Sequence, residues 1–162
     1  MLVTRQNKIL SAAIALCMAA FFTMSSSPTA SAGSPTLVPV TITATYTFAG
    51  FPNVVGTFTT SGGGLGAISG TTTMNVGLIG PNGLVAHCVV TLIAPLGTIV
   101  IDQQCQFATS MPAPYPTGQG KGRWEIVGGT GIYANLFGNG SLTMPTTTQG
   151  DPQEAMTGYI YQ

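Results

Sequence analysis

Few residues in this chain of 162 could do chemistry. It has one histidine, His87, which lies beside Cys88. A lone histidine needs carboxylate or thiolate partners to hold a metal, and an orienting acid to activate a nucleophile. No acid lies near His87 in the sequence, and we expect its side chain to point away from the interior. The sequence therefore predicts no metal site, no catalytic triad and no cofactor.

The first 32 residues have the pattern of a cleaved export signal. Arg5 and Lys8 form a positive start, residues 9–22 are apolar, and residues 30–32 read Ala-Ser-Ala. The apolar run is shorter than the about 20 residues that cross a membrane. We expect a signal peptide over residues 1–32 and a secreted mature domain over residues 33–162 with no membrane segment. The alternative is a lipoprotein anchored at Cys17, although Leu16 stands where such a signal needs a small residue.

Charges are sparse in residues 33–162. Lys121 and Arg123 stand against four acids, so the net charge is 2 − 4 = −2. The acids are Asp102, Glu125, Asp151 and Glu154. Nucleic acids and anionic membranes are bound through clustered lysine and arginine, so the composition argues against both as partners.

The alternation of side chains predicts an all-β domain. Between residues 38 and 48 apolar side chains occupy the even positions and threonine most of the odd ones, which is the period of a half-buried strand. Glycine and proline mark off seven more strands. Their ranges are 54–60, 66–76, 84–93, 98–109, 122–127, 132–137 with an extension to 143, and 155–161. Eight short strands are typical of a sandwich or a barrel, and we favour a single closed eight-stranded antiparallel β-barrel.

Residues 118–140, GQGKGRWEIVGGTGIYANLFGNG, carry a family resemblance. The run IVGGTG, with G-x-W before it and Tyr133 two residues after it, resembles the penultimate hairpin of dirigent proteins. It is also similar to the allene oxide cyclase barrel and to small secreted bacterial proteins built on that barrel. The resemblance implies a closed eight-stranded barrel with a central cavity, cyclase or isomerase activity, and assembly into dimers or trimers. These families carry charged or acidic residues at the cavity, and we match none of them to a position here.

Cys88 and Cys105 are the cysteines that remain after export. An even pair in a secreted chain indicates a disulfide. If Leu96 and Gly97 are the central residues of the turn between strands 84–93 and 98–109, the two cysteines lie directly opposite each other. We therefore expect a Cys88–Cys105 disulfide. A redox role is the alternative, but the chain has no C-x-x-C motif.

The alternation also predicts which side chains line the interior. We expect Trp124 to be the largest, and Asp102 and Glu125 to face outward. Asp151 and Glu154 fall in or beside a loop, so no charged residue is assigned to the interior. The candidate ligand-binding residues are Tyr46, Thr72, Gln103, Trp124, and Tyr133 or Asn135 according to the phase of strand 132–137. The plainer interpretation of these polar groups is that they are hydrogen-bonded within a core.

Three functions fit this sequence. The apolar inner face favours a secreted barrel that binds a small apolar ligand in its cavity. The resemblance supports a cyclase or isomerase that works mainly by shaping a reactive substrate. A threonine-rich outer face would suit a structural or surface-interaction protein.

Overall fold

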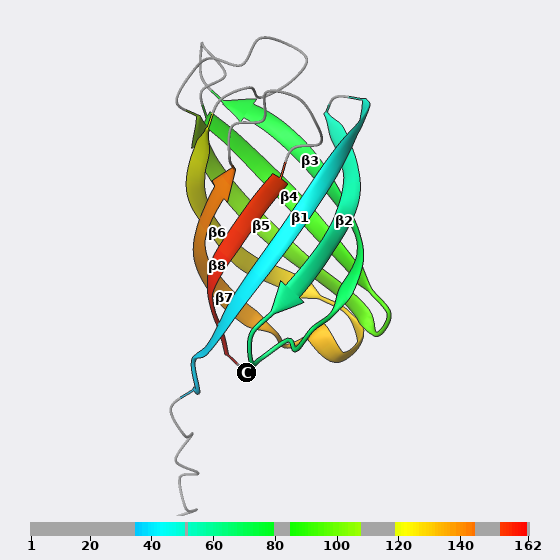
Figure 1. Cartoon of the computed structure of the whole chain (residues 1–162), viewed down its shortest axis with the longest axis vertical. Coiled ribbons are helices and arrows are strands. Elements are labelled where there is room, and N and C mark those ends of the chain that lie inside the picture. The colour runs from blue at the N-terminus through cyan, green and yellow to red at the C-terminus, as the bar shows by residue number, and fades with distance from the viewer. Residues whose placement is uncertain (1–34, 51, 80–84, 108–118, 145–152, 162) are drawn as a thin grey trace, which may run out of the picture. The chain divides into compact units, whose positions relative to one another are not determined.

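The computed structural model describes residues 35–50, 52–79, 85–107, 119–144 and 153–161. Eight antiparallel strands form a closed barrel in chain order, and β1 pairs with β8 to complete it (Figure 1). The strands are β1 (Val38–Gly50), β2 (Asn53–Ser61), β3 (Ser69–Ile79), β4 (Val85–Ala94), β5 (Gly97–Phe107), β6 (Gly120–Gly129), β7 (Phe137–Met144) and β8 (Gln153–Tyr161). The predicted all-β class and closed eight-stranded barrel are confirmed. The predicted export signal, residues 1–32, lies outside the described residues.

Alternation sets the two faces of each strand, and β1 illustrates it. Val40, Ile42 and Ala44 are buried, whereas Thr43 between them is exposed. A shift of one residue in the pairing would bring the threonines inside and expose the apolar set. The apolar period therefore fixes which face of β1 points inward and excludes a one-residue shift in its pairing with β2 and β8.

Trp124 packs against a part of the barrel wall that has no side chains. It pairs with Gly140 on β7, which pairs in turn with Gly158 on β8. A Cβ atom on Gly140 would lie 2.8 Å from Trp124 Nε1, and one on Gly158 would lie 2.8 Å from Trp124 Cζ2. The indole Nε1 donates to the carbonyl oxygens of Ser141 at 3.1 Å and Thr157 at 3.3 Å. The two glycines thus make room for the largest side chain of the core.

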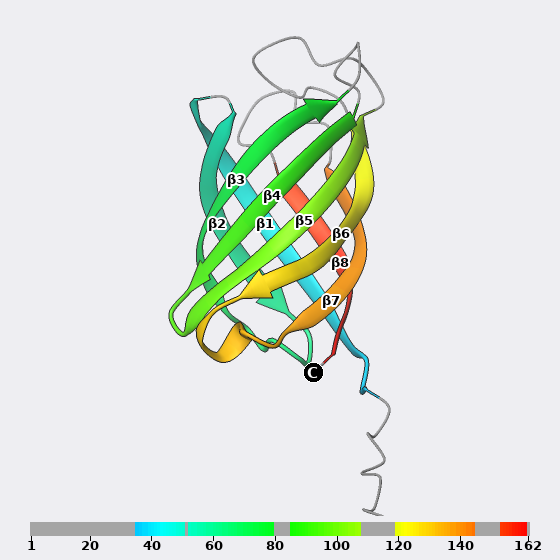
Figure 2. The ribbon, with the colours of Figure 1, turned by 180° about the vertical axis from the view of Figure 1, so that it is seen from behind.

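Three described connections lie at one end of the barrel, because antiparallel strands in chain order place alternate connections at the same end. They are residues 62–68, 95–96 and 130–136 (Figure 2). Gly97 and Gly131 approach each other closely there, and both have positive φ, 149° and 62°. A side chain on Gly131 would collide with the carbonyl group of Leu96. Glycine at these positions therefore lets the last connection pack against the hairpin of β4 and β5.

The strand predicted over residues 132–137 with an extension to 143 begins later than predicted, so its first part is wrong and the extension is confirmed. Residues Gly131–Tyr133 form a short 3-10 helix, η1, and β7 begins only at Phe137. The backbone N–H groups of Tyr133 and Ala134 bond to the carbonyl groups of Thr130 and Gly131. The left-handed Gly131 turns the chain into this helix, and Tyr133 and Leu136, which follow, are buried in the core.

The pairing register of the hairpin between β4 and β5 is shifted by two residues from the prediction. Ala94 pairs with Gly97, so the central residues of the turn are Pro95 and Leu96. Proline suits the first central position of a turn because its φ is fixed, and glycine suits the position that ends the turn. This turn chemistry decides the register of the whole hairpin.

The predicted disulfide is wrong for the same reason. Cys88 lies opposite Gln103, and Cys105 lies opposite Ala86. Both cysteines are buried and free. Such diagonal neighbours in a sheet are about 7–8 Å apart, which is beyond the usual Cα separation of a disulfide. The two thiols share the inner face without being bonded.

Candidate functional site

Four of the predicted lining residues lie in the barrel interior. Tyr46, Thr72, Gln103 and Trp124 are each 2% exposed or less. Their predicted burial is correct, and their role in ligand binding stays a prediction. The other two candidates differ in burial: Tyr133, which belongs to η1, is buried, whereas Asn135 is exposed.

Glu154 is the interior residue that the sequence analysis missed. The sequence predicts it in or beside a loop, but β8 begins at Gln153 and Glu154 lies on its inner face, opposite Ala44. Its side chain is 0% exposed. The sequence does contain a pattern that indicates its burial. Met156 and Ile160 occupy inner positions of β8, and extending this alternation toward the start of the strand reaches Glu154. The expectation that no charged residue lies inside is therefore wrong.

Tyr46 and Glu154 are joined by a buried hydrogen bond. The hydroxyl of Tyr46 donates to Glu154 Oε2 at 2.7 Å, and the two residues belong to β1 and β8. Ala44 and Gly56 are the small residues beside them on the inner face, since Ala44 pairs with Glu154 and Gly56 pairs with Tyr46. These small neighbours leave room for the phenol and the carboxyl to meet.

Burial governs the charge state of this pair. It raises the pKa of Glu154 from the ordinary 4.5 to about 7, although the hydrogen bond from Tyr46 and then the nearby Gln103 amide lower it in part. Burial, followed by the charge of Glu154, raises the pKa of Tyr46 well above its usual value. Near neutral pH the carboxyl group can therefore be either protonated or ionised, while the phenol keeps its proton. A group of this kind can donate or accept a proton at physiological pH.

Three buried polar atoms near this pair have no hydrogen-bond partner among the described residues. They are Thr72 Oγ1, Gln103 Oε1 and Glu154 Oε1. The amide Nε2 of Gln103 donates only to the weak acceptor Met156 Sδ, at 3.2 Å. A buried polar group left unpaired typically costs about 1–3 kcal/mol. We call Tyr46, Thr72, Gln103 and Glu154 the interior polar cluster.

The two free thiols lie close to this cluster. Cys88 is directly opposite Gln103, and Cys105 lies two residues further along β5. Burial, followed by the charge of Glu154, raises the pKa of each thiol to about 12. Because the thiolate is the reactive form, neither cysteine is suited to act as a nucleophile.

Among the described residues, the outer face carries a contact between His87 and an acid that lies far from it in the sequence. His87 Nε2 lies 2.7 Å from Asp102 Oδ1, and both side chains are partly exposed. His87 faces outward as predicted, and the hairpin brings Asp102 of β5 beside it although no acid lies near His87 in the sequence. Among the described residues no group of three or more histidine, cysteine and acidic side chains could hold a metal ion.

Comparison with known proteins finds no matching family, no similar curated protein and no similar solved structure.

Proposed function

We propose that the barrel binds a small, mainly apolar ligand in its interior, and that the interior polar cluster holds the ligand's single polar group. The observation that carries this proposal is the set of unpartnered atoms in the cluster, Thr72 Oγ1, Gln103 Oε1 and Glu154 Oε1. Ligand sites are commonly apolar with a few convergent polar groups. A ligand hydroxyl or amine would give these oxygens the donors that they lack among the described residues.

The rest of the inner face supports an apolar body for this ligand. The other inward residues of β4 and β5 are almost all hydrocarbon or thiol side chains, among them Val90, Leu92, Ile99 and Ile101. A ligand that carried a permanent charge would have to leave water for this surface at great cost. We therefore expect a neutral ligand with one hydrogen-bonding end, and we expect the protein to be secreted, as its first 32 residues suggest.

Binding of N-phenylnaphthylamine tests this proposal. This neutral, apolar fluorophore has one N–H donor and brightens when it leaves water. We expect it to bind the purified protein and to be displaced better by decanol than by decane, because only decanol has a polar end. Gln103→Leu, of similar volume, should remove the preference for decanol. Failure of the fluorophore and of both competitors to bind would contradict the proposal.

One observation favours a second function, that of a cyclase or isomerase. Glu154 is a buried acid hydrogen-bonded to Tyr46, and the resemblance to allene oxide cyclases implies charged or acidic residues at the barrel cavity. In this reading Glu154 would exchange a proton with a reactive substrate and Tyr46 would hold the carboxyl in place. Incubation with an allene oxide should then enrich one enantiomer of a cyclised product, and Glu154→Gln should abolish that enrichment. A racemic product from the unaltered protein would exclude this activity for that substrate.

A further inference from the structure

Two grooves on the outer face of the barrel meet on β7. One, of about 590 Å³, lies over β1, β8 and β7 and reaches the end of β2, and the other, of about 680 Å³, lies over β5, β6 and β7. Asn139 and Gly140 line both grooves. We call the two grooves together the outer track.

The strand register places the outward side chains of the track in rows that cross five strands. One row, in order from β1 to β5, is Pro39, Tyr159, Asn139, Glu125 and Asp102. The next row runs in the same way from Thr41 to Gln104. Neighbouring strands are about 4.8 Å apart, so the track is long enough for a chain of several linked rings rather than for one small molecule.

Gly140 and Gly158 lie between the two rows and line the groove. They are the glycines whose other side contacts Trp124. The outer track is therefore separated from the indole by a wall that is one strand layer thick. Trp124 is the only tryptophan of the chain, so its fluorescence should respond to a molecule in the groove.

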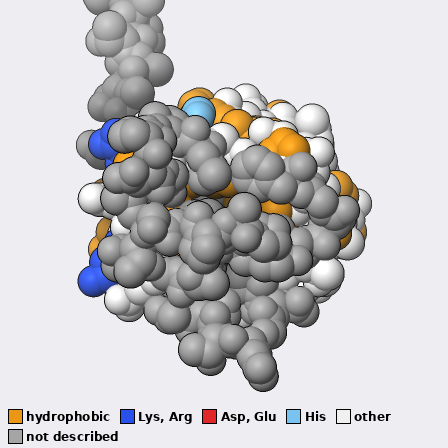
Figure 3. Space-filling model, turned by 90° about the horizontal axis from the view of Figure 1, so that it is seen from above, with side chains coloured by type: hydrophobic (Ala, Val, Ile, Leu, Met, Phe, Trp, Pro, Cys, Tyr) orange, Lys and Arg blue, Asp and Glu red, His pale blue; other side chains and the backbone are white. Residues whose placement is uncertain are grey.

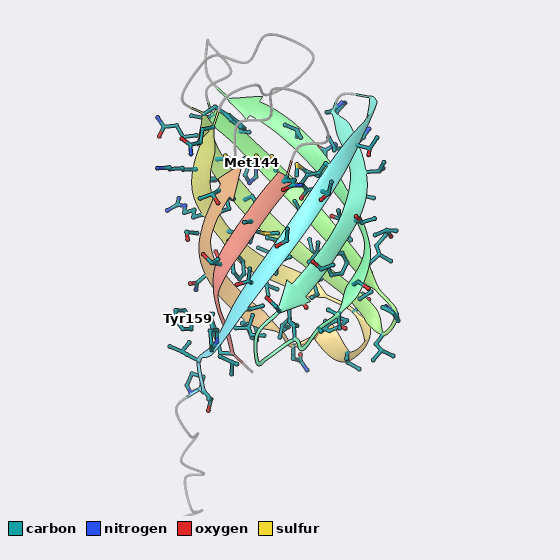
Figure 4. The ribbon with its side chains drawn as sticks, in the orientation of Figure 1. Met144 and Tyr159 are labelled. Atoms are coloured by element: carbon teal, nitrogen blue, oxygen red, sulfur yellow. The ribbon has the colours of Figure 1, made fainter. Side chains whose placement is uncertain are left out.

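The track presents one aromatic ring among hydroxyl and amide groups. Tyr159 is 52% exposed and projects from β8 near its end (Figure 4). Asn139 lies directly opposite Tyr159, and Ser141 lies opposite Thr157 with their hydroxyl oxygens 3.2 Å apart. Among the described residues, no charged side chain lines the groove at this end of the track.

The other end of the track adds charges of both signs. Asp102 and Glu125 face each other across β5 and β6, and Arg123 Nη2 donates to Gln104 Oε1 at 2.8 Å. Seen along the barrel, the lysine and arginine side chains appear on one side only (Figure 3), as expected from Lys121 and Arg123 on β6. Two acids beside one track-lining arginine do not suit a polyanion.

These features of the outer track exclude some classes of partner and favour one. An extended peptide that adds a strand needs an exposed sheet edge, and this closed barrel has none. A protein interface needs an apolar core, whereas the track has a single exposed aromatic ring. We propose that the outer track binds a neutral oligosaccharide, with one sugar ring stacked on Tyr159 and its hydroxyl groups bonded to Asn139 and to the side chains beyond.

Titration of the purified protein with cellohexaose, maltohexaose and N-acetylchitohexaose tests this proposal. We expect at least one of them to bind with a Kd below about 1 mM, by calorimetry and by a change in Trp124 fluorescence. Tyr159→Ala should weaken that binding by about tenfold or more, as truncation of a central aromatic residue does. Asn139→Ala, which removes a residue common to both grooves, should also weaken it.

Phe137→Ala is the matched control. Phe137 is 54% exposed on neighbouring β7, stacks on Tyr161 and lies in neither groove. Its replacement should leave saccharide binding unchanged. Binding of N-phenylnaphthylamine should survive Tyr159→Ala, which separates the outer track from the interior proposed above.

Several results would overturn the oligosaccharide proposal. One is no binding of the three hexasaccharides up to about 10 mM. A second is equal binding of a hexagalacturonate, because a polyanion should be disfavoured. A third is an equal loss of binding in Tyr159→Ala and Phe137→Ala. The last is a dimer that Tyr159→Ala dissociates while saccharide binding stays unchanged, since a second copy would then occupy the track.

Discussion

The barrel interior contains two regions that are equally buried but differ in how fully their polar groups are hydrogen-bonded. Around Trp124 the indole N–H reaches two carbonyl oxygens, and Gly140 and Gly158 give the ring its space. Around Glu154 three buried oxygens have no partner among the described residues. Buried polar groups are nearly always paired in folded proteins. The Trp124 region is thus fully hydrogen-bonded within the fold, whereas the Glu154 region keeps unused hydrogen-bonding groups, which the ligand proposed above would satisfy.

The largest expected effect comes from the Trp124 region. Trp124→Ala should lower the free energy of unfolding by about 3–5 kcal/mol, because burial is lost and a cavity remains. A domain of this kind is stable by only about 5–15 kcal/mol, so the variant should be marginal. Urea denaturation followed by circular dichroism would measure the change. Trp124→Phe should lose clearly less, and equal losses for the two variants would contradict the packing described here.

The Glu154 region should make the free energy of unfolding depend on pH. Between pH 4.5 and 7 the unfolded chain releases the proton of Glu154 while the folded barrel keeps it, since burial raises the pKa to about 7. This contribution to stability is complete below pH 4.5 and is lost as the pH rises to 7. The free energy of unfolding should therefore fall by about 3 kcal/mol over this window.

Glu154→Gln provides the control for that pH dependence. The amide has nearly the same shape and does not titrate, so denaturation of the variant should show much less slope between pH 4.5 and 7. An unchanged slope in the variant would mean that another group causes it, and the account of Glu154 would fail.

Tyr46→Phe should have a smaller effect within the same region. It removes the donor to Glu154 Oε2 and should cost about 1–2 kcal/mol at pH 7. Because the hydrogen bond with Tyr46 lowers the pKa of Glu154, the pH transition should also move upward. Tyr159→Phe, at an exposed tyrosine, is the control and should change neither quantity. A downward shift in Tyr46→Phe would contradict the hydrogen bond.

The smallest effect is expected outside both regions. Glu125 adjoins Trp124 in the chain but is exposed and faces Asp102 across the sheet. Glu125→Ala should change the free energy of unfolding by less than about 0.5 kcal/mol. If chemical denaturation showed Glu125→Ala to be as damaging as Trp124→Ala, the contrast between inner and outer positions would collapse.

The sequence predicted the Trp124 region better than the Glu154 region, and the reason is physical. Burial of Trp124 follows from alternation within one strand, which is a local property. Burial of Glu154 depends on where β8 begins, and the polar residues before it resemble a loop. The apolar run after Gly131 has the composition of a strand, yet one left-handed glycine directs it into η1.

The pairing register between strands is the second feature that the sequence did not predict correctly. The pairing of β4 with β5 is shifted by two residues from the predicted register. This shift keeps every side chain on its predicted face but changes which residues lie opposite each other. Cys88 and Cys105 therefore remain inward, as expected, while losing the contact that a disulfide needs. Alternation determines a face, and only turn geometry determines a partner.

The pairing of β1 with β8 has a consequence for how the molecule is made. Every other strand pair joins neighbours in the chain, but this seam brings together residues as far apart as Val38 and Ile160. The last strand must therefore be synthesised before the cylinder can shut. The hydrogen bond from Tyr46 to Glu154 crosses this seam, so the acid gains this partner only once β1 and β8 have paired. Its proton uptake would signal, within a refolding experiment, the moment at which the cylinder shuts.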